Sequence, residues 1–137
     1  MLLEMQTKIL LVSDNEPVRD SLSGVLQSEN YEVVAAANAQ EAFESRRQIG
    51  LLLVDLDLPA EEGWTAIQRI KAFNPFLPII VMTGQSDLRE LVAAAGVSAL
   101  VERPIDVPAL LQILRELLAE PVQSRVQRIC NHESDFR

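Results

Sequence analysis

Short apolar runs alternate along the chain with segments whose apolar residues recur at helical spacing. The runs predict five strands, at residues 8–12, 31–36, 51–55, 78–83 and 100–102. The segments between and after them predict helices at residues 17–29, 39–47, 64–73, 87–95 and 107–118. Strands that alternate with helices in this way form a parallel sheet covered on both faces. The pattern therefore predicts a three-layer, doubly wound α/β fold with five strands.

Polar residues stand where four of these strands end. The run 51–55 is apolar throughout, which favours a central position in the sheet, and its last residue is Asp55. Asp14 follows the first strand, Thr83 closes the fourth, and Arg103 follows the fifth. In a parallel sheet the carboxyl ends lie on one edge, where open α/β folds build their sites. We therefore expect these four side chains to lie close together.

Two carboxylates, a hydroxyl and a cation are a set that suits a magnesium ion and a phosphoryl group. Mg²⁺ prefers oxygen ligands and usually takes one or two carboxylates together with water and phosphate oxygens. An aspartate can form an acyl phosphate when the charge of the incoming phosphoryl group is neutralised. Asp55 is the candidate nucleophile, and Asp14 is a candidate metal ligand.

Each of these residues also has an ordinary structural interpretation. Asp14 or Asn15 can cap the first helix, and Asp55 can cap the turn after its strand. Thr83 is a good strand residue, and Arg103 can be a solvated loop residue. Their joint occurrence at strand ends favours the functional interpretation. By contrast, we interpret the acidic pair 61–62 beside Gly63 as a solvated turn that caps the third helix.

Composition limits the remaining choices. The 137 residues, 48% of them hydrophobic, suffice for one domain, which we place at 1–120 with a C-terminal extension or linker stub at 121–137. A net charge of −8 argues against direct binding to nucleic acid or to a membrane. The single cysteine, Cys130, allows no internal disulfide, and we expect a cytoplasmic protein.

At this point the motifs carry a family resemblance: the chain resembles the receiver domain of two-component response regulators over residues 8–118. The first of these motifs is the polar run after the first strand, Ser13-Asp14-Asn15-Glu16. The second is Asp55 followed by Pro59 and Gly63. The others are the fourth strand with Thr83-Gly84, and Arg103-Pro104.

The resemblance implies a flavodoxin-like strand order and a phosphoryl group donated to Asp55 by a histidine kinase or phosphotransfer protein. It implies Mg²⁺ bound by Asp14, by Asp55 and by the backbone carbonyl of Asp57. Thr83 would be the switch hydroxyl, and Arg103 would meet the phosphoryl group. The face made by helices 87–95 and 107–118 would then bind an effector domain or a second copy of the chain. The expected protein is a signalling module and not an enzyme.

Three positions depart from the family pattern. Ser13 replaces the first acid of the usual pair, which leaves at most a water-mediated contact to the metal and predicts weaker magnesium binding. Arg103 replaces a lysine, and Leu100 replaces the aromatic switch residue of the last strand. These changes keep a second hypothesis open, a pseudo-receiver that signals without phosphorylation. A third, less favoured hypothesis is a phospho-aspartate phosphatase with Asp57 as general acid.

Overall fold

The computed structural model describes residues 6–120, so the expected extension at 121–137 lies outside the described residues. The elements follow in the order β1 (Lys8–Val12), α1 (Glu16–Ser28), β2 (Glu32–Ala36), α2 (Ala39–Glu44), β3 (Leu51–Asp55), the 3-10 turn η1 (Pro59–Glu61), α3 (Glu62–Phe73), β4 (Ile79–Thr83), α4 (Arg89–Ala94), β5 (Ala99–Glu102) and α5 (Val107–Ala119). The predicted alternation of strands and helices is confirmed.

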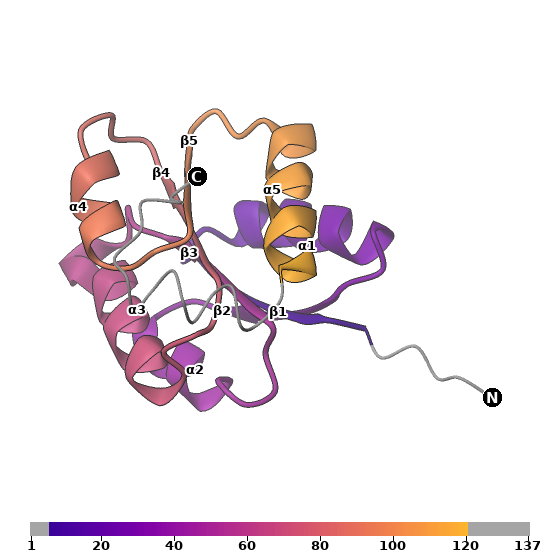
Figure 1. Ribbon diagram of the computed structural model, residues 1–137, viewed down its shortest axis with the longest axis horizontal. Coiled ribbons are helices and arrows are strands. Elements are labelled where there is room, and N and C mark those ends of the chain that lie inside the picture. Colours follow the sequence, from indigo (N-terminus) through magenta and orange to yellow (C-terminus); the bar gives the residue numbers. More distant parts are fainter. Residues whose placement is uncertain (1–5, 121–137) are drawn as a thin grey trace.

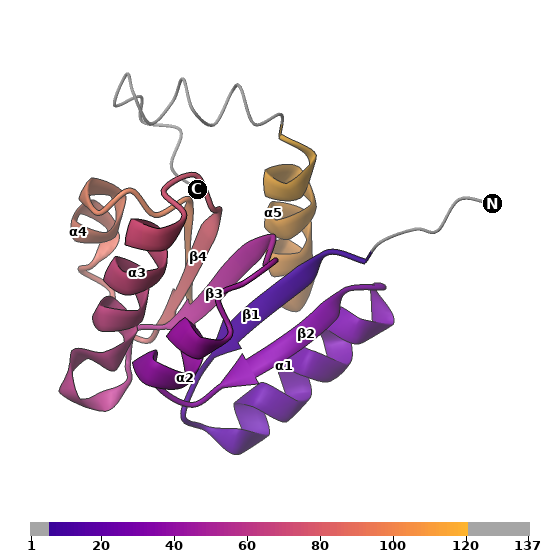
Figure 2. The ribbon, with the colours of Figure 1, turned by 90° about the horizontal axis from the view of Figure 1, so that it is seen from below.

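The five strands form one sheet in the order β2-β1-β3-β4-β5, and every neighbouring pair is parallel. Helices α1 and α5 cover one face, while α2, α3 and α4 cover the other (Figures 1 and 2). The chain passes from β1 outward to β2 and returns to β3 on the other side of β1. The strand order therefore reverses between β1 and β3, the place where doubly wound sheets open a crevice at their carboxyl edge.

Strand β3 shows how the sheet makes two apolar layers. All five of its residues are buried. Leu51 and Leu53 belong to the cluster under α1 and α5, and Leu52 and Val54 belong to the cluster under α2, α3 and α4. Successive side chains of a strand point to opposite faces, so a central strand needs apolar residues at every position. The sequence placed β3 correctly for this reason.

Short polar side chains begin three of the helices. The side-chain oxygens of Asn15, Asn38 and Asp106 accept hydrogen bonds from the backbone N–H groups of Val18, Glu41 and Ala109 in α1, α2 and α5. Such caps satisfy N–H groups that have no partner inside the helix. Of the two caps considered for the first helix, the structure uses Asn15.

Two predicted helices are shorter in the structure. Helix α2 ends at Glu44 and not at Arg47, and the backbone of Gln48 then takes a left-handed conformation with φ of 62°. Helix α4 begins at Arg89 and not at Asp87, and Leu88 at its N-cap position makes no side-chain capping hydrogen bond. The helix is stopped at Gly96, whose φ of 79° suits glycine.

The acidic residues 61–62, which were expected to cap the third helix, behave differently in the structure. Glu61 has a left-handed backbone with φ of 56° and makes no capping hydrogen bond, so its predicted capping role is wrong. A capping residue normally has an extended backbone that turns its side chain toward the helix N–H groups. Glu62 lies in the first turn of α3, and its Oε1 accepts a 3.4 Å hydrogen bond from the Ala39 N–H. This carboxylate therefore links α3 to α2.

None of the helices within residues 6–120 is long and apolar enough to cross a bilayer.

Candidate functional site

The buried polar side chains of the described residues are Ser13, Asp55 and Thr83, and all three stand where strands end. Backbone hydrogen bonds that continue the sheet hold these ends together. The Ser13 N–H donates to the Ala36 carbonyl at 3.0 Å, and the Arg103 N–H donates to the Thr83 carbonyl at 2.8 Å. The sheet thus carries its regular pairing up to the residues of the site.

Asp55 is the centre of this cluster and is 4% exposed. Its Oδ1 accepts a 2.8 Å hydrogen bond from the Asp57 N–H. Its Oδ2 accepts from Ser13 Oγ at 3.3 Å and forms a 2.7 Å ion pair with Arg103 Nη2. A buried carboxylate needs such partners because the low-dielectric surroundings do not solvate it. The turn-capping alternative is thus present as well, since the bond from Asp57 is of that local kind.

Arg103 joins two carboxylates. Its Nη2 binds Asp55, and its Nη1 lies 2.6 Å from Oδ2 of Asp57. The planar guanidinium offers several N–H donors in a fixed fork, so one arginine can serve two acceptors at once. Arg103 is therefore not the free, solvated residue of the structural alternative. The peptide bond between Arg103 and Pro104 is cis.

The Thr83 hydroxyl makes its hydrogen bonds with residues other than Asp55. Its buried hydroxyl donates a 2.8 Å hydrogen bond to Oδ1 of Asp57 and accepts a 3.1 Å bond from the Gln85 N–H. The Gly84 N–H also donates to Asp57, at 2.6 Å from Oδ2. The carboxylate of Asp57 therefore lies between the end of β4 and Arg103.

The sequence did not indicate this position of the Asp57 side chain. It assigned to Asp57 a backbone carbonyl for the metal and, in the less favoured phosphatase hypothesis, a general-acid carboxyl. The spacing of two residues from Asp55 was visible in the sequence. However, residues alternate in direction only within a strand, and Asp57 lies in the turn after β3. No sequence pattern indicated that its carboxylate would reach across to β4.

Gly63 allows the turn after β3 to close. A Cβ at this position would lie 2.5 Å from the Asp55 carbonyl oxygen and 3.0 Å from the Leu56 Cα. The first turn of α3 therefore packs directly on the backbone that carries Asp55, and a side chain would push the two apart.

The two carboxylates expected to hold a magnesium ion, one fewer than in the usual arrangement with an acidic pair, both keep acceptor capacity. Oδ1 of Asp55 accepts a single hydrogen bond and keeps acceptor capacity, and Asp14 is exposed directly after Ser13. Within residues 6–120, Asp14 has no hydrogen bond or ion pair that would occupy its carboxylate. Those residues contain no group of three or more carboxylate, histidine or cysteine side chains placed to hold a metal. The Asp57 carboxylate does not face a metal site, because it accepts hydrogen bonds from Thr83, Gly84 and Arg103.

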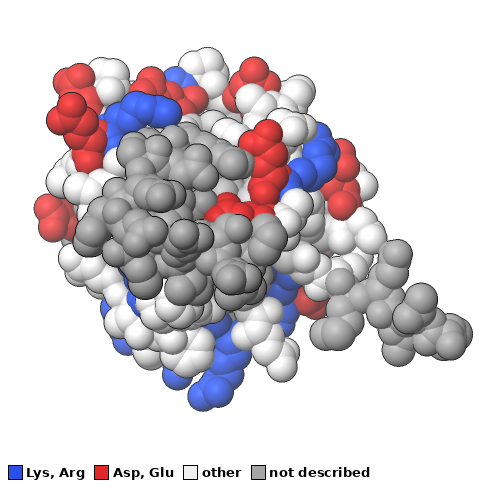
Figure 3. Space-filling model, in the orientation of Figure 1, with Lys and Arg blue, Asp and Glu red and all other residues white. Residues whose placement is uncertain are grey.

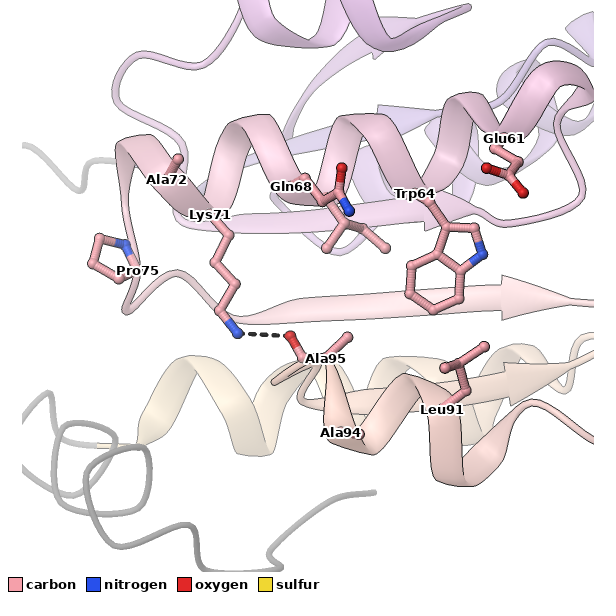
Figure 4. A pocket seen from close by; sticks show the side chains of 10 residues that line it. Glu61, Trp64, Gln68, Lys71, Ala72, Pro75, Leu91, Ala94 and Ala95 are labelled. Carbon is pink, nitrogen blue, oxygen red and sulfur yellow. Dashed lines mark hydrogen bonds between the residues drawn. The ribbon is translucent and has the colours of Figure 1, made fainter.

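A groove of about 890 Å³ lies apart from these residues, between α3 and α4. Figure 4 shows Trp64 and Leu91 facing each other from the two helices, and Lys71 reaching across at the other end. Lys71 Nζ donates a 2.7 Å hydrogen bond to the Ala95 carbonyl at the end of α4. Burial lowers the pKa of Lys71 below the usual range of a lysine.

Figure 3 shows charged side chains of both signs on one face of the molecule. On the face in Figure 3, the basic residues of the described part of the chain are separated by acidic and uncharged ones. No continuous basic patch for a polyanion is visible there. The view is in keeping with the excess of 20 acidic over 12 basic residues in the sequence.

Comparison with known proteins decides the family. Residues 9–115 match the family model of the response regulator receiver domain. The chain belongs to this family. The resemblance inferred from the strand-end residues is thereby confirmed, and so is the predicted flavodoxin-like order of the sheet. Receiver domains interact with histidine kinases or phosphotransfer proteins and bind Mg²⁺ at an acidic pocket.

Several characterised relatives share the domain. Sporulation initiation phosphotransferase F of Bacillus subtilis (strain 168) is 26% identical over 118 residues, which cover 83% of this chain and 95% of the relative. The transcriptional regulatory protein ZraR of Klebsiella oxytoca is 32% identical over 83% of this chain but only 27% of its own length. A cyclic di-GMP phosphodiesterase of Thermotoga maritima is 28% identical over 86% of this chain and 32% of its own length.

This receiver domain therefore spans about a third or less of the length of several longer relatives. Among solved structures, a CheY-like receiver domain protein from Methanospirillum hungatei JF-1 superposes with a TM-score of 0.77 at 27% identity. The match covers 90% of this chain and 99% of that one. The receiver domain of NtrX from Brucella abortus, with a TM-score of 0.76 at 24% identity, shows the same fold.

Proposed function

We propose that this receiver domain accepts a phosphoryl group on Asp55 from a histidine kinase or phosphotransfer protein in two-component signalling. The observation that carries the proposal is the buried Asp55 carboxylate at the end of the central strand, paired at 2.7 Å with Arg103. An acid that is buried, paired and still placed at the crevice edge of a doubly wound sheet is suited to react there.

The transfer involves one bond formed and one broken. An oxygen of Asp55 attacks the phosphorus, and the bond between phosphorus and the donor's histidine nitrogen breaks. The nitrogen keeps the electron pair of that bond. The guanidinium of Arg103 then stabilises the added negative charge, because it lies beside the attacking carboxylate.

Asp14, Asp55 and the carbonyl of Asp57 are the residues that would hold Mg²⁺, and Ser13 would contribute at most through a water molecule. When bound, the ion neutralises the charge of the phosphoryl oxygens. Thr83 is the proposed switch hydroxyl, whose engagement with a phosphoryl oxygen would alter the connection from β4 to α4. We assign residues 1–120 to the receiver domain. We propose that the face made by α4 and α5 binds an effector domain or a second copy of the chain.

A specific observation favours a second candidate, a receiver that signals without phosphorylation. The donors of Thr83, Gly84 and Arg103 already hold a carboxylate, that of Asp57. The phosphatase hypothesis receives less support, because both oxygens of Asp57 act as acceptors and a general acid must donate a proton.

The test uses acetyl phosphate with Mg²⁺ and reads the intact mass of the protein. We expect a gain of one phosphoryl group in the wild type and none in Asp55→Asn. Asp87→Asn removes one exposed carboxylate after β4 and is the matched control, which should be labelled like the wild type. Equal labelling of Asp55→Asn would refute Asp55 as the acceptor. The absence of labelling in every protein would favour the phosphorylation-independent candidate.

A further inference from the structure

The carboxylate of Asp57 is bound by more donors than a solvated surface acid needs. Its Oδ1 accepts from Thr83 Oγ1 at 2.8 Å, and its Oδ2 accepts from the Gly84 N–H and from Arg103 Nη1, each at 2.6 Å. Gln85 Nε2 adds a longer contact of 3.4 Å to Oδ1. We call these four donor groups the anion cradle.

The anion cradle combines the donor types that bind phosphate oxygens in proteins. A hydroxyl, a backbone N–H and a guanidinium all donate, and the last bond is charge-assisted. Gly84 has no side chain, and a Cβ there would lie 3.4 Å from Oδ2 of Asp57, so the glycine lets the carboxylate approach its N–H closely.

The anion cradle adjoins Asp55. Arg103 contributes one nitrogen to the cradle and the other to Oδ2 of Asp55, at 2.7 Å. The Asp57 N–H in turn binds Oδ1 of Asp55 at 2.8 Å. An anionic group attached to an oxygen of Asp55 would consequently lie beside the cradle and within reach of the same donors.

A phosphoryl group and the Asp57 carboxylate cannot both use these donors. Each N–H and O–H supplies one good hydrogen bond, and like charges a few ångströms apart repel each other most strongly where water is partly excluded. The Asp57 side chain is only 30% exposed in the structure, so the repulsion would be incompletely screened.

We propose that Asp57 is a built-in competitor, whose carboxylate occupies the anion cradle of the unphosphorylated chain and must leave it when an anion binds at Asp55. The inference rests on the proposed function, because the competing anion is the phosphoryl group of Asp55. A hollow of about 500 Å³ next to Asp57, lined among others by Leu58, Trp64 and Leu88, gives the side chain space to leave. Competition of this kind raises the concentration of the phosphoryl donor that is needed to phosphorylate Asp55.

The test compares the binding of beryllofluoride, a mimic of the phosphoryl group, at a fixed magnesium concentration. Trp64 lines the same hollow as Asp57, so its fluorescence reports on the movement. We expect Asp57→Asn to bind the mimic roughly tenfold more tightly than the wild type, the order expected when one nearby like charge is removed. Asp57→Ala, which empties the anion cradle, should bind at least as tightly.

Two controls separate this inference from the proposed function. Asp87→Asn makes the same change in net charge at an exposed position and should bind like the wild type. Asp55→Asn should bind no mimic. The amide proton resonance of Gly84 adds a direct readout, because it should shift upfield in Asp57→Ala when the bond to the carboxylate is lost.

The outcomes differ for the two proposals. If the wild type binds the mimic through Asp55, and both Asp57 variants bind no more tightly, the competitor role is refuted while the phosphoacceptor role stands. If the Asp57 variants bind beryllofluoride tightly and the wild type shows no binding, the competitor role of Asp57 is supported strongly. If no variant responds at millimolar magnesium, both proposals fail. An equal gain in Asp87→Asn would reduce the effect to net charge and refute the specific role of Asp57.

Discussion

The strand-end site and the groove between α3 and α4 lie close together in the chain but are stabilised in different ways. At the site, Asp55, Asp57 and Arg103 are joined by hydrogen bonds and ion pairs of 2.6 to 2.8 Å, and the sheet fixes their backbones. In the groove, α4 is a six-residue helix without a side-chain cap, and its only fully buried residue is Val92. A single polar contact, from Lys71 to Ala95, joins the two walls among the residues that line the groove.

The difference suggests where structural change is easiest. Short helices with few buried side chains belong to the less stable parts of a protein. Helix α4 follows Thr83 and the Gly84 N–H by only a few residues, so a change at the anion cradle reaches α4 through residues 84–88. We therefore expect substitutions at the site to cost more stability than those in the groove, and the following variants test this from the largest effect to the smallest.

Gly63→Ala should have the largest effect. The new Cβ would lie 2.5 Å from the carbonyl oxygen of Asp55, and neither backbone can yield without moving the site. We expect the free energy of unfolding to fall by about 3 kcal/mol, as for severe overpacking. Urea unfolding measures it. Gly24→Ala, in α1 with nothing within 4 Å of the added Cβ, is the control and should instead gain about 0.5 to 1 kcal/mol. Equal effects in the two variants would contradict the close packing at Gly63.

Arg103→Ala removes the cation that joins Asp55 and Asp57. We expect a loss of about 1.5 to 3 kcal/mol in unfolding free energy, the range for hydrogen bonds to charged groups, because the buried Asp55 carboxylate loses its partner. Arg103→Lys should recover only part of this loss, since an ammonium lacks the fork that serves both carboxylates. Binding of beryllofluoride should weaken in the same order. A fully restored Arg103→Lys would show that the bridging geometry is unimportant.

Ser13→Asp should act in opposite directions with and without metal. Ser13 is fully buried, and its hydroxyl lies 3.3 Å from Oδ2 of Asp55. When a chelator removes metal ions, a second carboxylate at this position should lower the free energy of unfolding by about 2 kcal/mol. Millimolar Mg²⁺ should reverse the loss, because the added carboxylate is an oxygen ligand. Thermal unfolding with a chelator and with Mg²⁺ measures both. Ser13→Asn is the uncharged control, and an equal response to Mg²⁺ in both variants would place the metal elsewhere.

Lys71→Met tests the polar contact of the groove. Loss of the bond to Ala95 should cost about 1 kcal/mol at neutral pH, since the lysine is half-buried and its stem is replaced by a similar apolar chain.

The pH dependence of this variant follows from the lowered pKa of Lys71. Above that pKa the unfolded chain binds more protons than the folded one, so wild-type stability rises with pH up to the usual pKa of lysine. The desolvation cost of the charged lysine is present below this window and is relieved within it. Lys71→Met should lack this rise, and urea unfolding across the alkaline range measures it. Parallel pH profiles would show that Lys71 is better solvated than the structure indicates.

Leu91→Ser should have the smallest effect. Leu91 is 56% exposed on α4, and exposed substitutions usually change stability by less than about 0.5 kcal/mol. Val92→Ser, at the adjacent fully buried position of the same helix, is the matched contrast and should lose about 2 kcal/mol or more. Similar losses in both, measured by urea unfolding, would mean that Leu91 is covered.

The sequence alone determined the elements and the edge at which the site forms. Apolar runs and helical periods are local properties of the chain, and they located every strand and helix, with errors at the ends of α2, α3 and α4. The rule that parallel strands share one carboxyl edge then predicted that Asp14, Asp55, Thr83 and Arg103 would lie close together. The motif spacing that resembled receiver domains identified the family.

Only the tertiary structure decided which side chains meet. The left-handed residues Ala60 and Glu61 and the close approach of Gly63 shape the turn after β3, and no periodicity encodes that shape. The turn directs the Asp57 carboxylate to Thr83, Gly84 and Arg103, a contact that the sequence had not suggested. The groove likewise depends on how α3 and α4 pack. Contacts between loops and helices that are distant in sequence depend on the backbone geometry of all the residues between them. The hydrophobic patterns of strands and helices, by contrast, repeat every two to four residues and can be recognised locally.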